Sequence, residues 1–178
     1  PLAVQTVLKK LNQSGFEAYL VGGCVRDFLL QKRPQDFDIT TSATPEEMRR
    51  CFSGLKTVDT GVRHCTLTVL VDAMSIEVTT FRTEGVYSDH RRPDSVSFTR
   101  CLKKDLKRRD FTINAMAYHP ETGLVDLFHG QSDLRQKQIR CVGNADKRFS
   151  EDALRMLRAL RFASVLGFRV EKGTAESL

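Results

Sequence analysis

Two aspartates in an apolar, strand-like run constrain this chain more than any other feature. Residues 35–39 read Gln-Asp-Phe-Asp-Ile, with carboxylates at Asp36 and Asp38. Because side chains of a strand alternate between its faces, Asp36 and Asp38 are expected on one face, with Phe37 and Ile39 in the core. The Cα atoms of two such residues lie about 6–7 Å apart. This spacing suits divalent cations that assist phosphoryl transfer, but two solvated acids at a strand end give the same pattern.

A pair of glycines precedes the aspartates. Residues 18–21 predict a short buried strand, Gly22 and Gly23 break it, and residues 24–30 have the apolar spacing of a helix. In that geometry, bare backbone N–H groups and a helix N-terminus can bind an anion. Arg26, one turn into the predicted helix, would add a charge-assisted contact to a phosphate. A tight turn that needs two glycines for steric reasons fits the pattern equally well.

The remaining periodicity predicts helices and strands in a mixed order, which indicates an α+β fold. An opening helix is expected over residues 2–11, and a second helix is expected to begin at Thr44 and Pro45, a typical N-cap and first-turn pair. Residues 66–71 and 75–81 are β-branched and alternate, so they predict an antiparallel hairpin that turns at residues 72–74. In that hairpin Glu77 shares a face with Thr79.

A further helix is predicted near the end of the sequence. Ser150 is a natural N-cap, and Glu151 and Asp152 would place negative charge in the first turn, where the helix dipole favours it. Asp152 and Arg155 are three residues apart and would be neighbours on the helix surface, where capping and surface ion pairs alone can explain them. The predicted apolar stripe of this helix comprises Leu154, Leu157, Leu160 and Phe162.

Five motifs in a fixed order resemble one known family. Gly22-Gly23-x-Val25-Arg26-Asp27 and Asp36-x-Asp38 resemble the head of the class II tRNA nucleotidyltransferases (CCA-adding enzymes) and bacterial poly(A) polymerases, in the polymerase β superfamily. The further segments that fit are Arg108-Arg109-Asp110-Phe111-Thr112-Ile113-Asn114-Ala115, Gly130-x-x-Asp133-Leu134 and Glu151-Asp152-x-x-Arg155. The likeness spans about residues 16–168.

This resemblance implies a domain organisation. It predicts a polymerase β-like nucleotidyltransferase head over residues 1–143, with a small mixed β-sheet flanked by helices, followed by the start of a helical neck domain over residues 144–178. The body and tail domains, with which full-length relatives hold the tRNA, are expected to be absent. The chain is therefore expected to bind nucleotide but to add to tRNA weakly.

The resemblance also implies an activity. It predicts template-independent addition of C and A from CTP and ATP to the 3′ end of tRNA, by Mg²⁺-dependent attack of the 3′-hydroxyl on the α-phosphate. Two Mg²⁺ ions would be held by Asp36 and Asp38, with Glu77 completing the catalytic face. The residues that the resemblance assigns to nucleotide binding are Gly22, Gly23, Arg26, Arg109, Asp110, Asn114, Asp152, Arg155, Arg158 and Arg161.

Base selection in this family depends on one Asp/Arg pair, here Asp152 and Arg155. Cytosine and adenine both present an exocyclic amine beside a bare ring nitrogen, so a carboxylate can accept from the amine and a guanidinium can donate to the ring. Guanine and uracil would leave both side chains unpaired, which costs enough to reject them. Such a pair can select C and A without a nucleic-acid template.

Composition is compatible with this interpretation. The 178 residues carry a net charge of +6, which suits a polyanionic partner. No apolar run approaches the ~18 residues of a membrane span, so no membrane partner is expected. The cysteines are scattered and never spaced Cys-x-x-Cys, which predicts reduced thiols in a cytoplasmic protein.

Residues 84–95 are polar and rich in turn formers, which predicts a mobile loop too charged to pack. The sequence does not predict an oligomeric state.

Several alternatives stay open at this stage. A poly(A) polymerase, an enzyme that adds only C or only A, and a non-catalytic nucleotide- or RNA-binding module share this scaffold. Residues 58–64 resemble the tRNA-end-adding branch, whereas Cys65 replaces the glycine that the family usually has. The presence of Asp36, Asp38 and Arg155 favours an enzyme over a binding module.

Overall fold

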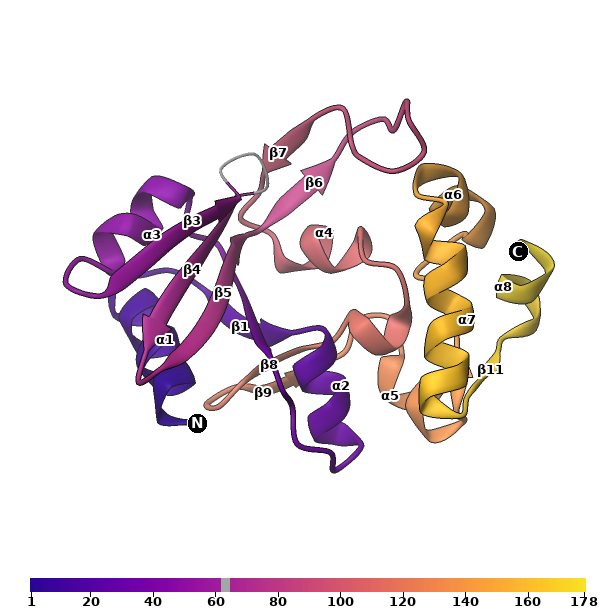
Figure 1. The fold of residues 1–178 in the computed structure, drawn as a ribbon, viewed down its shortest axis with the longest axis horizontal. Coiled ribbons are helices and arrows are strands. Elements are labelled where there is room, and N and C mark those ends of the chain that lie inside the picture. Colours follow the sequence, from indigo (N-terminus) through magenta and orange to yellow (C-terminus); the bar gives the residue numbers. More distant parts are fainter. Residues whose placement is uncertain (62–64) are drawn as a thin grey trace.

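A twisted mixed sheet forms one end of the molecule, and helices that follow it form the other (Figure 1). The computed structural model describes residues 1–61 and 65–178. Its helices are α1 (Leu2–Gln13), α2 (Gly23–Leu29), α3 (Pro45–Cys51), α4 (Leu102–Lys107), α5 (Gly130–Arg135), α6 (Ala145–Glu151), α7 (Leu154–Leu166) and α8 (Lys172–Glu176), with the 3₁₀ turn η1 (Thr112–Asn114). Its strands are β1 (Ala18–Val21), β2 (Phe37–Thr41), β3 (Lys56–Gly61), β4 (Thr66–Val71), β5 (Met74–Thr80), β6 (Arg82–Glu84), β7 (Val96–Phe98), β8 (Ala117–His119), β9 (Gly123–Val125), β10 (Gln138–Ile139) and β11 (Arg169–Val170).

The main sheet has the strand order β3-β4-β5-β2-β1-β8-β9. Strands β2 and β5 are parallel, whereas the other neighbours are antiparallel, so the predicted small mixed sheet is confirmed. The predicted hairpin is confirmed as β4 and β5. It turns through Asp72 and Ala73, whose φ angles of 49° and 62° are those that a tight two-residue hairpin turn requires.

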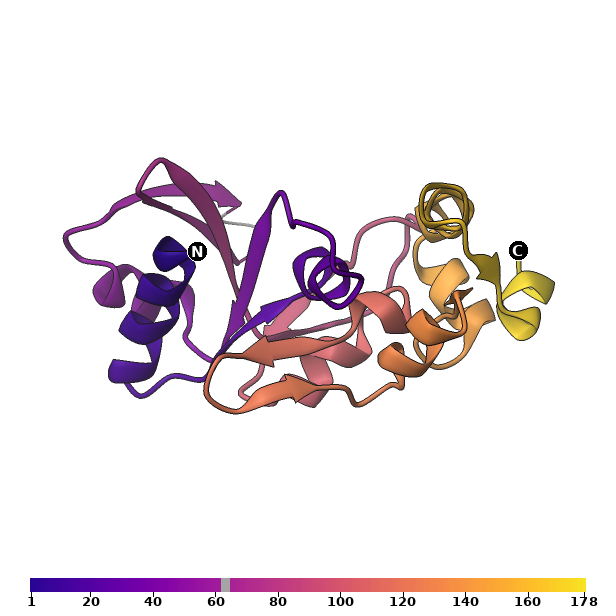
Figure 2. The same cartoon turned by 90° about the horizontal axis from the view of Figure 1, so that it is seen from below.

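Helices α1 and α3 cover one face of the sheet (Figure 2). The apolar residues of α1, among them Val7 and Leu11, are fully buried against Ile39, Ile76 and Val78 of the strands. The predicted start of α3 is confirmed, because Thr44 accepts from the Glu47 N–H and Glu47 accepts from the Thr44 N–H. This capping box satisfies two backbone donors that the helix leaves open.

A second apolar core joins α2 to the C-terminal helices. Phe111 and Ile113, beside the sheet, pack with Phe149 of α6, Ala159 of α7 and Phe168. The pairing of β10 with β11 ties the segment after α7 back to the segment after α5. The C-terminal elements therefore share a core with the residues that support the sheet.

The predicted helix near the end of the sequence is placed differently in the structure. The chain is already helical from Ala145, with Asn144 as the N-cap, so Ser150 and Glu151 form the last turn of α6 and Ser150 caps nothing. Helix α7 begins after Asp152, whose carboxylate accepts from the Leu154 N–H at 3.0 Å. Asn144 is also a preferred N-cap residue, and the helix begins after it and not after Ser150.

The predicted apolar stripe of this helix is wrong for its leucines. Leu157 and Leu160 are 64% and 55% exposed, and Leu154 is 39% exposed. The face that packs on the core carries Ala159, fully buried, together with Arg155 and the partly buried Phe162. The small side chain of Ala159 lets the helix approach the core closely, which turns the leucines outward.

The segment 84–95 is more ordered at its beginning than its charge predicts. Glu84 ends β6 and is buried, because Arg82 and Arg108 donate to it at 2.9 and 3.0 Å. Tyr87 also donates to Glu84, and the backbone carbonyl of His90 accepts from the Ala153 N–H at 2.9 Å. The prediction that this loop is too charged to pack is therefore wrong for Glu84, since paired charges can be buried, whereas most of residues 85–95 are exposed.

Three further expectations can be compared with the described residues. None of their helices is both long and apolar enough to cross a membrane. The cysteines are free thiols, as their scattered positions predicted. Cys65 adopts a φ of 63°, a region that glycine enters at lower cost, which accounts for the glycine usual at this position. Of the segment 58–64, residues 62–64 lie outside the described part of the chain.

Candidate active site

One face of the sheet carries the predicted acidic group. The register aligns Asp38 of β2 with Glu77 of β5, so both carboxylates point to the same face of two neighbouring strands. Ile76 and Val78 are buried on the opposite face, as the alternation predicted. Asp36 directly precedes β2 and is close enough for its charge to raise the pKa of Asp38. The three acids predicted from the sequence are thus brought together.

Burial and like charge make the ionised form of Asp38 costly. Burial is the largest cause that raises the pKa of Asp38, and the negative charges of Glu77 and Asp36 raise it further. Arg109 is the cation that opposes this shift. Among the described residues, no group of three or more Asp, Glu, His or Cys side chains is arranged to enclose a metal ion by itself. This face carries excess negative charge that an added cation would relieve.

The glycine elbow lies directly beside these acids. Val21, the last residue of β1, pairs with Asp38, and the chain then turns at Gly22 with φ 75° and ψ −133°. A Cβ atom at Gly22 would lie 3.4 Å from Arg109 Nη1 and 3.8 Å from Asp38 Oδ2. The predicted strand, glycine turn and helix are confirmed, and the bare backbone at Gly22 adjoins both charged side chains.

Arg109 is a partly buried cation at the site. Its Nη2 lies 3.5 Å from Asp105 Oδ2, and burial lowers the pKa of its guanidinium group. Its Nε is buried and has no hydrogen-bond partner in the part of the chain that the structure describes. A buried N–H group without a partner is rare in folded proteins. Arg109 therefore has one buried N–H group to which no described residue offers an acceptor, while its Nη1 lies beside Gly22.

Asp105 holds Arg109 and was not predicted as a site residue. It is fully buried and accepts from the Thr40 hydroxyl at 3.1 Å and from the Arg82 N–H at 3.2 Å. Burial alone would raise the pKa of Asp105, but Arg108 and Arg109 hold that pKa below its ordinary value. As an acid within a run of Lys and Arg, it resembled a solvated helix face. Asp105 is a single acid within a run of Lys and Arg residues, and that pattern could have identified it as a site residue.

Four of the predicted nucleotide-binding residues form a continuous chain of polar contacts. Arg26 Nη1 donates to Asn114 Oδ1 at 2.9 Å, and Asn114 Nδ2 donates to Asp110 Oδ1 at 3.3 Å. Asp110 Oδ2 in turn accepts from Arg158 Nε at 2.9 Å. This chain connects α2 through η1 to α7. The structure thus brings together side chains that lie far apart in the sequence.

Three guanidinium groups surround the ring of Phe162. Those of Arg26, Arg158 and Arg161 lie 5.3, 5.2 and 5.9 Å from the ring centroid, within the range of cation–π contacts. Two of these arginines come from α7 and one from α2. Such a concentration of positive charge near the glycine elbow favours an anion with several phosphates.

The predicted pair Asp152 and Arg155 is not an ion pair in the structure. Arg155 is 7% exposed, and its Nη1 donates to Glu151 Oε2 at 2.8 Å and to the Arg148 carbonyl at 3.0 Å. Its Nη2 donates to the Arg108 carbonyl at 3.3 Å. The partner of Arg155 is therefore Glu151, four residues earlier, a helical spacing that the sequence already contained.

Comparisons with known proteins agree with this geometry. A family model described as "Poly A polymerase head domain" matches residues 18–140. Because this match covers more than half of the chain, the chain belongs to that family, and the resemblance inferred from the motifs is confirmed.

Named relatives are similar over nearly the whole chain. CCA-adding enzymes of Lactobacillus delbrueckii subsp. bulgaricus and Enterococcus faecalis are 54% and 55% identical over 97% of this chain, which spans 43% and 42% of their lengths. The solved structure of the Bacillus stearothermophilus CCA-adding enzyme in complex with CTP superposes with a TM-score of 0.90 at 45% identity, over 99% of this chain and 42% of that one. A tRNA nucleotidyltransferase complexed with a primer tRNA and an incoming ATP analog superposes with a TM-score of 0.74 at 34% identity, over 96% of this chain and 48% of that one.

Proposed function

We propose that this chain is the catalytic part of a template-independent nucleotidyltransferase that adds C and A from CTP and ATP to the 3′ end of tRNA. The observation that carries the proposal is the alignment of Asp38 with Glu77 beside Asp36, against Gly22 and Arg109. Carboxylates next to a bare glycine turn and a partly buried arginine suit a triphosphate with its metal ions.

The residues present fit Mg²⁺. This ion binds proteins through one or two carboxylates and takes its other ligands from water and substrate phosphates, so an enclosed cage of protein ligands is not required. The raised pKa of Asp38, caused by burial and by Glu77 and Asp36, supports a cation at this face. Asp36 and Asp38 would hold the metal, two ions in all, and Glu77 would complete the face. When bound, Mg²⁺ would assist deprotonation of the 3′-hydroxyl and neutralise charge that develops on the phosphate.

The chain's own residues bind and orient the nucleotide in this proposal. The backbone at Gly22 and Gly23 approaches the triphosphate, and Arg109, whose Nη1 lies beside Gly22, donates to it. Arg26, Arg158 and Arg161, gathered around Phe162, add positive charge. Asp110 and Asn114 hold two of these arginines in place through their hydrogen bonds. Pyrophosphate leaves when the 3′-hydroxyl has attacked the α-phosphate.

Asp152 and Arg155 are proposed to read the base. The contacts of Arg155 to Glu151, Arg148 and Arg108 use three of its five N–H groups, which leaves donors for a ring nitrogen of cytosine or adenine. Asp152 is half-buried beside the start of α7 and can accept from the exocyclic amine. The contact to Glu151 supports this role, because a guanidinium held in one orientation discriminates better between bases.

The comparisons support the substrates and the domain organisation. One similar structure is a complex with CTP, and another is a complex with a primer tRNA and an ATP analog. The match of the head-domain model to residues 18–140 supports a head over residues 1–143 and the start of a neck over 144–178. Free cysteines support action in the reducing cytoplasm.

The name of the matching family keeps poly(A) synthesis as a second candidate. CCA addition and poly(A) synthesis would use the same acids and arginines, so only the nucleotides added to the RNA distinguish them. We would incubate the protein with tRNA that lacks its 3′ CCA end, Mg²⁺ and each labelled triphosphate in turn. Incorporation limited to C followed by A is expected, whereas a long homopolymer of A would favour the second candidate.

The matched variants are Asp38→Asn and Asp72→Asn, which remove a carboxylate from the site and from the hairpin turn. Asp38→Asn is expected to lower incorporation by about a thousandfold or more, because it removes charge that stabilises the transition state, while Asp72→Asn leaves incorporation unchanged. Magnesium-dependent CTP binding, measured by calorimetry, should weaken in the same variant. Full activity of Asp38→Asn would refute the proposal.

A further inference from the structure

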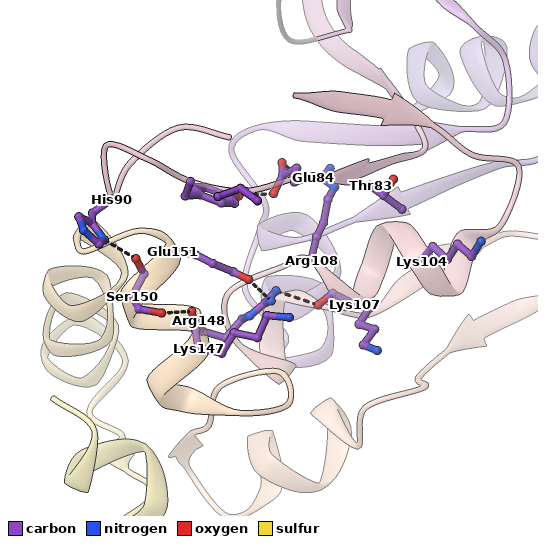
Figure 3. A pocket seen from close by; sticks show the side chains of 13 residues that line it. Thr83, Glu84, His90, Lys104, Lys107, Arg108, Lys147, Arg148, Ser150 and Glu151 are labelled. Atoms are coloured by element: carbon purple, nitrogen blue, oxygen red, sulfur yellow. Dashed lines mark hydrogen bonds and ion pairs between the residues drawn. The ribbon is translucent and has the colours of Figure 1, made fainter. Parts of the chain in front are cut away.

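A cleft outside the acidic face lies between the β6–β7 loop, α4 and α6 (Figure 3). Its volume is about 790 Å³. Lys104 and Lys107 of α4 and Lys147 of α6 line it, together with Arg108 and Arg148. We call it the lysine cleft. Asp36, Asp38, Glu77 and Gly22 do not line it, so it is a different surface from the nucleotide site.

The carboxylates of the lysine cleft are already neutralised. Glu84 accepts from Arg82 and Arg108 at 2.9 and 3.0 Å, and Glu151 pairs with Arg148 and with Arg155. Figure 3 shows the carboxylate of Glu151 directed toward Arg148. The acids of the cleft therefore have arginine partners and do not offset its lysines.

The three lysines, in contrast, remain available. Lys104, Lys107 and Lys147 are exposed, and none of them forms an ion pair with a carboxylate within residues 1–61 and 65–178. They come from helices α4 and α6, and all three line the same cleft. The cleft therefore has an excess of positive charge that the protein itself does not balance.

We propose that the lysine cleft binds the phosphate backbone of the RNA substrate, an inference that rests on the proposed function. Exposed lysines are flexible point charges and suit a polyanion whose phosphates are spread along a strand. A triphosphate is better matched by the clustered arginines around Phe162 at the other site. Protein interfaces are depleted in lysine, which disfavours an acidic protein as the occupant. A structure 34% identical to this chain holds a primer tRNA.

The cleft adjoins the supports of the base-reading arginine, which gives the contact a consequence. Arg148 and Glu151 line the cleft and also hold Arg155 through its Nη1. Arg108, on the other wall, accepts from Arg155 Nη2 through its carbonyl. RNA bound in the cleft would therefore contact the residues that orient Arg155, while Arg155 itself stays with the nucleotide.

The test replaces the three lysines together, as Lys104→Gln, Lys107→Gln and Lys147→Gln. The control replaces Lys9, Lys56 and Lys172, which are also exposed and lie on α1, β3 and α8. Both triple variants remove the same charge. Binding of tRNA that lacks its 3′ CCA end is measured by fluorescence anisotropy at several salt concentrations, and CTP binding with Mg²⁺ is measured by calorimetry. Circular dichroism checks that each variant is folded.

The cleft variant is expected to bind the tRNA at least about tenfold more weakly, and the slope of log K against log salt should shrink by about 2–3, since each phosphate contact contributes about 0.7–0.9. Its CTP affinity should not change, and the control should keep its tRNA affinity. Equal weakening in both variants would overturn the inference, because the overall charge of the protein would then explain the loss of tRNA affinity. No weakening in either variant would also overturn it, because the lysines of the cleft would then not contribute to tRNA binding.

Two other outcomes separate this inference from the proposed function. Unchanged tRNA affinity of the cleft variant, with intact Mg²⁺-dependent CTP binding, would overturn the lysine cleft alone. Failure of the unmodified protein to bind CTP would overturn the proposed function. If poly-glutamate binds to the cleft and the tRNA does not compete with it, an acidic protein is the occupant and the inference is wrong.

Discussion

Asp105 shows how a single buried charge can set the geometry of a site that it does not enter. It joins Thr40 of the acidic strand to Arg108 and Arg109, so the position of Arg109 beside Gly22 depends on it. Replacing one member of a buried ion pair leaves its partners uncompensated. Asp105→Asn keeps the shape and removes the charge, which isolates the electrostatic part of this role.

We expect Asp105→Asn to lower the free energy of unfolding by about 3 kcal/mol at neutral pH. Since Arg108 and Arg109 hold the folded pKa of Asp105 below its ordinary value of 3.8, its contribution is complete above that value and disappears as the pH falls through the folded pKa. The difference between wild type and variant, measured by urea unfolding, should therefore shrink below pH 3.8. A difference that grows on acidification would contradict this assignment.

Gly130 explains the Gly130-x-x-Asp133 motif as a packing requirement. A Cβ atom at Gly130 would lie 2.4 Å from the Thr112 carbonyl oxygen and 2.9 Å from the Met116 side chain, and Asp133 accepts from the Thr112 hydroxyl at 2.6 Å. Gly130 and Asp133 therefore hold α5 against the segment that carries Asn114.

Gly130→Ala is expected to destabilise the protein by about 2 kcal/mol or more, because a backbone atom has to move. The control is Gly173→Ala in α8, where the nearest atom would be at 3.5 Å, and there the change should be neutral or stabilising by up to about 1 kcal/mol. Thermal unfolding of both variants measures the contrast. Equal stability of the two would show that α5 can shift away from η1 without cost.

At the scale of elements, α7 has an orientation that its hydrophobic pattern does not predict. Its leucines face outward, and the contact with the core depends on Ala159. Arg155, Arg158 and Phe162 then lie toward the residues of the head. The contacts of these three residues and the small side chain of Ala159 together fix the rotation of α7.

Two substitutions test this orientation. Ala159→Leu is expected to cost about 1–3 kcal/mol of stability, because the core has no room for three more carbon atoms. Leu157→Gln should change stability by less than about 0.5 kcal/mol, as at other exposed positions. Denaturant unfolding of both variants measures the effect. A larger loss of stability from Leu157→Gln than from Ala159→Leu would mean that the leucines pack on the core.

At the scale of the whole molecule, the second apolar core makes the two ends of the chain interdependent. Phe111 beside the sheet and Phe149, Ala159 and Phe168 of the C-terminal part belong to one cluster. The chain of hydrogen bonds from Arg26 to Arg158 crosses the same boundary. Because the sheet and the C-terminal helices share this core, they should unfold together.

We therefore expect one cooperative transition on heating, with the same midpoint by far-ultraviolet circular dichroism and by tyrosine fluorescence. Ala159→Gly, which removes the side chain that fills the shared core, should lower that midpoint as a whole. Two separate transitions, with one that is insensitive to the substitution, would show that the sheet and the C-terminal helices are independent units.

Local patterns were sufficient for most of the sheet and for its acids. Alternation predicted β2, β4 and β5 and placed Asp36 and Asp38 on one face, because faces of a strand are decided by position along the chain. The family resemblance added Glu77 to this face, and the parallel pairing of β2 with β5 brings it beside Asp38. The capping signals of Thr44 and the glycine turn at Gly22 were equally local. The sequence by itself therefore determined which face of β2 is acidic and where the glycine turn lies.

Only the tertiary structure decided the arrangement around that face. The burial of Asp105, the rotation of α7 and the choice of Glu151 as the partner of Arg155 depend on elements that are distant in the sequence. A charge is buried only where partners from other elements neutralise it, and a helix turns toward the core whichever face packs more closely. Periodicity and spacing along one segment carry no information about those partners.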